Sequence, residues 1–292
     1  MPAVRGARPI KNKELTDFHF HLDKNDIVIP TMQQYTDTWK EWLNFSSCKS
    51  LLGLEKFNYA DYTQGTSQTF DQFILRHSKD RQIICLSGDF QYHACLGKHV
   101  NFKYIDYPHH LEEALDGIGL HALIISAPFS DYGVIHPDFE HIMQVCKVHD
   151  IPVCLDLAYW GISKNMHIDL NNFPAIEEVT CSLSKPFYTL ENHRVGIRFT
   201  RQYVDDGVSM LNEVKMQNKY SMALGVEYMR NFSPDYNWEK YRSIYEDVCE
   251  QQGLVYTDTV IFGLGDEARH NEFNRGVHGN YRVCVSEWLA ND

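Results

Sequence analysis

The stretch "HALIISAPFSDYGVIHPDFEHIMQVCKVHDIPVCLDLA", residues 121–158, holds two apolar runs separated by a helical pattern. The runs "HALIISAP" and "PVCLDLA" are continuously apolar, which is typical of strands that are covered on both faces. Between them, Phe139, Ile142 and Cys146 fall on one helical stripe, and Pro137 suits the first position of the helix. A strand, a helix and a second strand in this order predict a βαβ unit, and therefore a largely parallel sheet.

Similar patterns continue on both sides of this unit. Further strand-like runs are "QIICLS" from Gln82, "EEVTCSLS" from Glu177 and "RVGIRFT" from Arg194. After residue 203 come two long amphipathic stretches, "VSMLNEVKMQNKYSMALGVEYMRN" and "DYNWEKYRSIYEDVCEQQ", and a last apolar pair that predicts a small hairpin. We therefore expect an α/β fold in which helices sandwich a mainly parallel sheet. The expected divisions are an N-terminal arm (1–45), a large ligand-binding domain (46–203) and a smaller α+β domain (204–292).

Composition limits the classes of function. The chain has 292 residues, of which 43% are apolar, so it can bury a sizeable core. A net charge of -12 without a long basic cluster argues against binding to nucleic acid or to anionic membranes. No apolar run is long enough to cross a bilayer, and the basic start lacks the apolar stretch of a signal peptide.

The cysteines point to a reducing compartment. They are scattered singly, without a C-x-x-C pair, and several lie inside strand-like runs. They are Cys48, Cys85, Cys95, Cys146, Cys154, Cys181, Cys249 and Cys284. We therefore expect a cytoplasmic protein.

Reactive side chains lie at the ends of three of the predicted strands. These are Asp156 and Tyr159 in "DLAY", Lys185 in "SLSK" and Arg194 in "RVG". Each has an ordinary structural explanation on its own, such as a helix cap, a core ring or a surface ion pair. Ligands of open α/β sheets gather at the carboxyl ends of the strands. In this order and spacing, the three motifs resemble those of the fold-type I pyridoxal-phosphate enzymes, the aspartate aminotransferase superfamily, with this chain as an unusually short member.

The resemblance implies a role for each reactive group. Asp156 would keep the pyridine nitrogen of the cofactor protonated, so that the ring accepts electrons. Lys185 would form a Schiff base with the cofactor aldehyde and then act as a general base at the substrate α-carbon. Tyr159 would donate a hydrogen bond to the ring oxygen.

The cofactor phosphate is expected at a helix N-terminus, where free N–H groups and the helix dipole favour an anion. "TQGTSQTFDQFILRH" offers such a start upstream of the sheet strands, where the family has its phosphate loop. The residues implied in phosphate binding are Gly65, Thr66, Ser67, Ser182, Ser184 and Arg194.

Three further residues complete the implied site. Phe90 in "LSGDFQYH" would stack on the cofactor ring, with Tyr92 as the competing candidate. Ser130 in "APFSDYG" stands where family members carry an asparagine that contacts the ring oxygen. Arg282 in "NYRVCVS" would bind the substrate carboxylate through two parallel hydrogen bonds, or would form an ordinary ion pair at the end of a strand.

The resemblance implies an aminotransferase that acts on α-amino acids and keto acids with pyridoxal 5'-phosphate as cofactor. It also implies a homodimer, to whose partner site Tyr59 or Tyr62 would contribute. The alternative within the family is a decarboxylase, lyase or oxidase. A non-catalytic binding protein on the same scaffold would be expected to lack the lysine or the aspartate, and both are present.

A different hypothesis starts from "DFHFHLD", in which His19 and His21 alternate on a strand-like stretch, as in amidohydrolase-type metal barrels. Alternate residues of a strand point to one face and would share a metal. The later strands show no matching ligands, and the helix-rich second half does not continue eight βα units. We therefore expect no metal, and we expect both histidines to pack near the entrance of the site or in the N-terminal arm.

Overall fold

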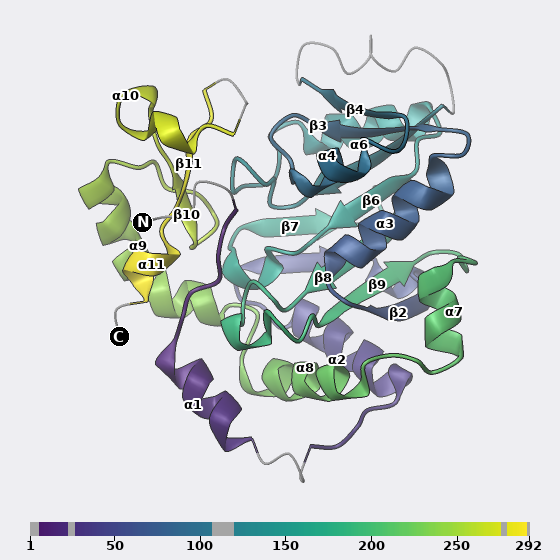
Figure 1. Cartoon of the computed structure of the whole chain (residues 1–292), viewed down its shortest axis with the longest axis horizontal. Coiled ribbons are helices and arrows are strands. Elements are labelled where there is room, and N and C mark those ends of the chain that lie inside the picture. Colours follow the sequence, from purple (N-terminus) through teal and green to yellow (C-terminus); the bar gives the residue numbers. More distant parts are fainter. Residues whose placement is uncertain (1–5, 23–26, 107–119, 276–278, 291–292) are drawn as a thin grey trace.

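The computed structural model describes residues 6–22, 27–106, 120–275 and 279–290. Its centre is a seven-stranded sheet with the spatial order β2-β9-β8-β6-β5-β3-β4 (Figure 1). In chain order, these strands are β2 (Tyr59–Thr63), β3 (Gln82–Leu86), β4 (Phe102–Ile105), β5 (His121–Ser126), β6 (Val153–Asp156), β8 (Ile176–Ser182) and β9 (Gly196–Thr200). All run parallel except β9, which is antiparallel to both of its neighbours. The predicted α/β class with a mainly parallel sheet is confirmed.

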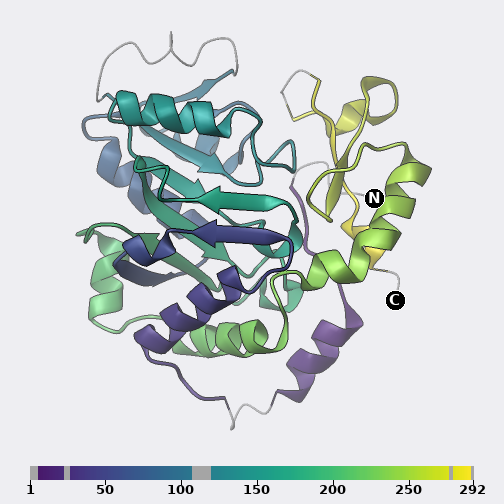
Figure 2. The same ribbon diagram turned by 180° about the vertical axis from the view of Figure 1, so that it is seen from behind.

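Helices cover both faces of the sheet, which explains the continuous apolar runs of β5 and β6. The described helices are α1 (Lys13–His21), α2 (Met32–Asn44), α3 (Thr66–His77), α4 (Tyr92–Leu96), α6 (Phe139–Val148), α7 (Gly207–Glu213), α8 (Lys219–Asn231), α9 (Tyr236–Gln252), α10 (Glu267–His270) and α11 (Ser286–Leu289). On one face, Phe70 and Phe73 of α3 pack against Ile83. On the other face, Ile84 belongs to a larger core with α2, α6 and α8. Figure 2 shows α2 and α6 on that side.

Some short elements were not expected from the sequence. A small parallel sheet joins β1 (Lys49–Leu52) to β7 (Met166–Asp169). Single 3-10 turns cover 54–56, 160–162, 188–190 and 271–273. The helix of the βαβ unit begins at Phe139 with Asp138 at its cap, so Pro137 precedes the helix rather than opening it.

The C-terminal residues form a core of their own. The predicted hairpin is present, with β10 (Phe262–Leu264) antiparallel to β11 (Arg282–Cys284). Side chains of α9 and of these strands pack together with Ala7 and Ile10 from the N-terminal segment. In Figure 1 this segment runs beside the C-terminal elements before it enters α1. The proposed division between residues 203 and 204 stays a prediction.

The first of the two long helices predicted after residue 203 is broken. It forms α7 and α8, and Lys215 between them has a positive φ of 59°. Asn218 then caps α8 by accepting a hydrogen bond from the backbone N–H of Ser221. Met222 and Leu224 of α8 pack in the core of the main sheet.

The N-terminal stretch with the two histidines is helical, so its strand-like interpretation is wrong. Asn12 caps α1, and Leu15 of this helix is fully buried. His19 Nδ1 lies 3.0 Å from the Tyr228 hydroxyl, and His21 Nδ1 lies 2.7 Å from the carbonyl of Asp17 in its own helix. Among the described residues, no group of three or more metal-ligating side chains is present. The fold and this geometry remove the basis of the metal-barrel hypothesis.

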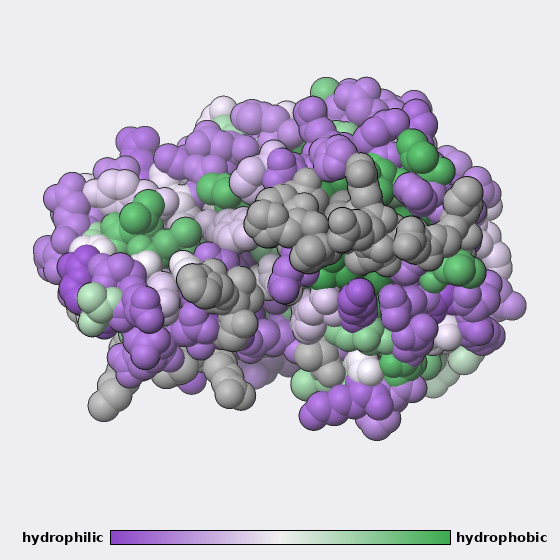
Figure 3. All heavy atoms as spheres, turned by 90° about the horizontal axis from the view of Figure 1, so that it is seen from above, coloured by the Kyte–Doolittle hydropathy of each residue, from purple (hydrophilic) through white to green (hydrophobic). Residues whose placement is uncertain are grey.

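The surface seen from above is mostly hydrophilic, with hydrophobic side chains in separate patches (Figure 3). Within the described residues, no helix combines the length and apolarity needed to cross a membrane.

Candidate active site

A cavity of about 530 Å³ lies at the carboxyl edge of the parallel strands. Parallel strands that share a sheet bring the residues after their carboxyl ends to one edge. Because β9 runs the opposite way, residues just before it reach the same edge. The predicted site residues that line this cavity are Thr66, Ser67, Phe90, Ser130, Asp156, Tyr159, Ser182, Ser184, Lys185, Arg194 and Arg282. The structure thus brings together all but one of the predicted site residues, and the remaining one, Gly65, caps the helix that supplies Thr66 and Ser67.

Asp156 and Lys185 face this cavity from neighbouring strands. Asp156 ends β6, where it accepts a hydrogen bond of 2.9 Å from the backbone N–H of Ala158. Burial raises the pKa of Asp156 to about 8, the nearby charge of Asp89 adds to this rise, and the Lys185 ammonium opposes it. Lys185 is half-buried, and its ammonium donates to the carbonyl of Ala7. A desolvated carboxyl and an amine therefore interact across one cavity.

A second part of the cavity is suited to an anion. Thr66 and Ser67 open α3, whose first N–H groups have no partner within the helix. Arg194 donates a hydrogen bond of 3.0 Å from Nη2 to the Ser67 hydroxyl. Gly65 has φ +79°, and a Cβ there would lie 2.7 Å from Arg194 Nη2. Glycine at this position thus lets the guanidinium lie directly against the start of the helix.

Two serines continue the same wall from β8. The hydroxyls of Ser182 and Ser184 lie 2.7 Å apart, and Ser182 also donates to the carbonyl of Val195. Gly196 pairs with Ser182 in the sheet, and a Cβ on it would lie 2.8 Å from the Cα of Gly65. The glycine of the "RVG" motif therefore allows the helix start, Arg194 and the serine pair to meet.

Arg282 also lines the cavity. Its Nη1 donates to the carbonyl of Ser130 at 2.7 Å and to the Ser130 hydroxyl at 3.0 Å, and it lies 3.5 Å from the Tyr159 hydroxyl. Ser130 is thus placed as a support for Arg282, while its implied contact with the cofactor ring oxygen stays a prediction. The Arg282 guanidinium also lies 5.1 Å from the centre of the Phe262 ring.

Both candidates for the stacking ring line the cavity. The rings of Phe90 and Tyr92 lie 5.9 Å apart at an interplanar angle of 18°. Behind them, His93 is buried against Phe70, and this burial lowers its pKa to about 3. The stacking of Phe90 on the cofactor ring, with Tyr92 as the competing candidate, stays a prediction.

Three charged residues of this region were missed by the sequence analysis. Asp89 accepts a hydrogen bond from the N–H of Ser126, and burial raises its pKa to about 6. Asp131 forms a buried ion pair with Arg275, a residue that also lines the cavity. Asp89 and Asp131 lie within "LSGDFQYH" and "APFSDYG", just after predicted strands, so their positions near strand ends were the available signal.

The tyrosines proposed to reach a partner subunit differ in position. Tyr59 is exposed on β2 at the edge of the sheet, with its ring 5.9 Å from that of Tyr203. Tyr62 is buried, and its hydroxyl donates to the carbonyl of Arg194 in the same chain. Tyr62 therefore supports the turn that presents Arg194.

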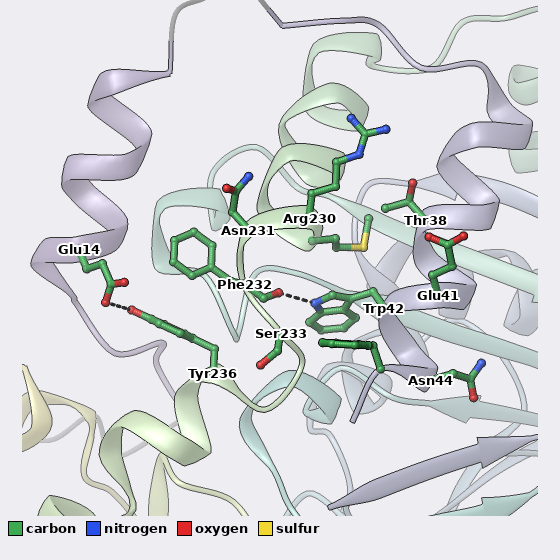
Figure 4. Close-up of a pocket in the computed structure, with 12 residues that line it drawn as sticks. Glu14, Thr38, Glu41, Trp42, Asn44, Arg230, Asn231, Phe232, Ser233 and Tyr236 are labelled. Carbon is green, nitrogen blue, oxygen red and sulfur yellow. Dashed lines mark hydrogen bonds between the residues drawn. The ribbon is translucent and has the colours of Figure 1, made fainter. Parts of the chain in front are cut away.

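A larger hollow, of about 810 Å³, lies between α1, α2 and the junction of α8 with α9 (Figure 4). Trp42 donates to the carbonyl of Phe232 there, and Tyr236 donates to the carboxylate of Glu14. None of the predicted site residues lines this hollow, and Glu14 is already paired with Lys240. The smaller cavity, with its convergent charged groups, is therefore the candidate active site.

Comparison with known proteins gives matches of structure alone. No family model and no curated protein matches the sequence. The pyridoxal-phosphate-bound C–S lyase of Staphylococcus hominis matches with a TM-score of 0.66 at 12% identity, over 95% of this chain and 84% of that chain. Histidinol-phosphate aminotransferase of Clostridium acetobutylicum gives 0.64 at 12% identity, over 99% and 98% of the two chains. Tyrosine aminotransferase of Leishmania infantum gives 0.64 at 14% identity, over 99% and 90%.

At these identities, the similarity establishes the shared architecture and leaves the reaction to the site itself. The mainly parallel sheet and the edge that carries the cavity agree with the architecture implied by the three sequence motifs. The chain has the fold of the fold-type I pyridoxal-phosphate enzymes.

Proposed function

We propose that this chain binds pyridoxal 5'-phosphate in the 530 Å³ cavity and transfers the amino group of an α-amino acid to a keto acid. The observation that carries the proposal is the convergence of Asp156 and Lys185 on a cavity with an anion-binding wall. When bound, the cofactor supplies a conjugated ring that accepts the electrons released as a bond to the substrate α-carbon breaks.

The residues present fit this cofactor. Burial holds the pKa of Asp156 so high that its charged form needs a cationic partner, and a protonated ring nitrogen supplies one. The start of α3, Ser67 and Arg194 offer the N–H groups, the hydroxyl and the guanidinium that a phosphate requires. Lys185 supplies the amine that would hold the cofactor through its aldehyde.

The chain's own side chains also suit the substrate. As a free neutral amine, Lys185 would take the proton from the substrate α-carbon, since it faces the same cavity as Asp156. Arg282 would bind the α-carboxylate and so fix the orientation of the substrate. Tyr159 lines the same cavity, and its hydroxyl lies next to Arg282.

We also propose a homodimer, with Tyr59 on the exposed edge strand as the side chain available to a partner. Exposed apolar side chains of the neighbouring α7 region, Met210, Val214 and Met216, support an interface there. Light scattering would measure the mass in solution. A monomer at all concentrations would contradict this part of the proposal.

A cytoplasmic location completes the proposal. All eight cysteines are free thiols, and six of them are buried. Free thiols in this number are typical of a reducing compartment. Fractionation of cells with an antibody against the chain would test the location.

The first experiment tests cofactor binding. The protein mixed with pyridoxal phosphate should show a visible absorbance band that borohydride abolishes, with the reduced label mapped to Lys185 by mass spectrometry. Lys185→Ala should keep the fold by circular dichroism and lose the label. A wild-type protein without band or label would refute the proposal.

The second experiment identifies the reaction. Turnover that depends on an added keto acid supports amino-group transfer. Release of ammonia or carbon dioxide without a keto acid would instead indicate a lyase or decarboxylase. The C–S lyase among the matching structures makes the lyase the alternative to test.

A further inference from the structure

Two arginines and one acid lie at the substrate end of the cavity. Arg275 and Arg282 line it, and Asp131 lies behind them, with side chains that are 4%, 4% and 1% exposed. Arg275 Nη1 forms a direct ion pair with Asp131 Oδ1, whereas Arg282 Nη1 lies 3.8 Å from the same oxygen. Asp131 is thus bound to Arg275 and only adjacent to Arg282. Asp89 acts on Arg275 through its charge, without a direct ion pair to it.

Among the described residues, the closest contacts of Arg282 are with neutral groups. Its hydrogen bonds to Ser130 use a carbonyl and a hydroxyl, and the Phe262 ring covers its guanidinium. These contacts hold the guanidinium in place without neutralising it. The two arginines and the acid together carry one net positive charge, and that charge is on Arg282.

Building on the proposed function, we propose that Asp131 neutralises the positive charge of Arg275. The site therefore accepts amino acids with one carboxylate and an uncharged side chain. A single α-carboxylate matches the charge of Arg282. A second carboxylate would have to displace Asp131 from Arg275, which would leave a buried acid without its partner.

The experiment measures the binding of two acids of equal chain length, valerate and glutarate, by calorimetry. It uses the protein with and without pyridoxal phosphate, because the three residues belong to the chain itself. Wild type should bind valerate at least about tenfold more tightly than glutarate. In Asp131→Asn, Arg275 becomes available, and the preference should shift toward glutarate by at least about tenfold. An unchanged preference would overturn the proposal.

A second variant tests whether the effect of Asp131→Asn comes from charge or from damage to packing. In Arg275→Gln, Asp131 loses its partner and is left with Arg282, so valerate binding should weaken by about tenfold. The double variant Asp131→Asn/Arg275→Gln removes both charges and should restore valerate binding, a rescue that damage to packing would not produce. Unchanged binding in Arg275→Gln, no rescue, or no carboxylate binding in either form of the wild type would each overturn the proposal.

The outcomes also separate this inference from the proposed function. Failure to form the visible band would refute cofactor binding, while the preference between the two acids can still be measured on the chain alone. A normal band with an unchanged preference would refute the role of Asp131 only.

Discussion

Replacing Asp156 with asparagine should make the cofactor-free protein more stable at neutral pH and should flatten its pH dependence. Burial raises the pKa of Asp156 in the folded chain to about 8, from an ordinary value of 3.8. Between these values, the folded state holds a proton that the unfolded state has released. The free energy of unfolding therefore falls as the pH rises through this window, because the unfolded state binds fewer protons.

The magnitude follows from a difference of one proton. One pH unit changes the free energy of unfolding by about 1.4 kcal/mol, so the contribution of Asp156 falls by about 2.7 kcal/mol between about pH 5 and pH 7. Asparagine has nearly the same shape, and its oxygen can accept the same N–H from Ala158. The burial of Asp89 also raises its pKa, and Asp89 is present in both proteins, so the difference between them reports on Asp156 together with its electrostatic coupling to Asp89.

Urea unfolding of wild type, Asp156→Asn and the control Asp80→Asn at three pH values would measure this difference. Asp80 is exposed, so its replacement should leave the pH dependence of the wild type unchanged. Added pyridoxal phosphate should reduce the pH dependence of the wild type, since a cationic ring nitrogen favours the charged carboxylate. Parallel curves for wild type and Asp156→Asn without cofactor would refute the reasoning.

Two further predictions concern the walls of the cavity. Gly65→Ala should cost about 1–3 kcal/mol and weaken pyridoxal-phosphate binding, because φ of +79° is strained for alanine and the new Cβ would push Arg194 away. Gly207→Ala, whose Cβ meets no heavy atom closer than 3.5 Å, should leave the affinity unchanged in a fluorescence titration; equal losses would contradict the argument. If Phe90 stacks on the ring, Phe90→Leu should weaken binding by about two- to tenfold and Tyr92→Leu by less, and the reverse order would assign the stacking to Tyr92.

The parts of the site that could be predicted share one physical origin. Asp156, Lys185 and Arg194 lie next to the ends of strongly apolar strands, and the carboxyl edge of a parallel sheet brings such residues together. The sequence therefore indicated both the chemical type of each side chain and the strand ends that bring the side chains together. Gly65 was identified differently, from a predicted helix start at the place where the resembled family has its phosphate loop.

The ion pair of Asp131 with Arg275 had no comparable signal. The two residues are far apart in the sequence, and both lie outside regular helices and strands. Contacts between such segments depend on how the core of the main sheet packs against the core of the C-terminal residues. Local sequence patterns do not predict this packing. For the two histidines, a local pattern was present but predicted the wrong element. The alternation in "DFHFHLD" is typical of a strand, whereas the cap at Asn12 and the packing of Phe18 against Tyr228 and Phe232 stabilise a helix.

The reversed direction of β9 has a consequence for how this architecture tolerates changes in length. Because β8 and β9 are antiparallel neighbours, one connection, residues 183–195, carries both Lys185 and Arg194. The span between the amine and the guanidinium is then set within a single loop, independently of the crossover helices. Deletions elsewhere can shorten the chain without altering that span, whereas inserting even one residue between 185 and 194 should separate the two groups from the ligand they would share.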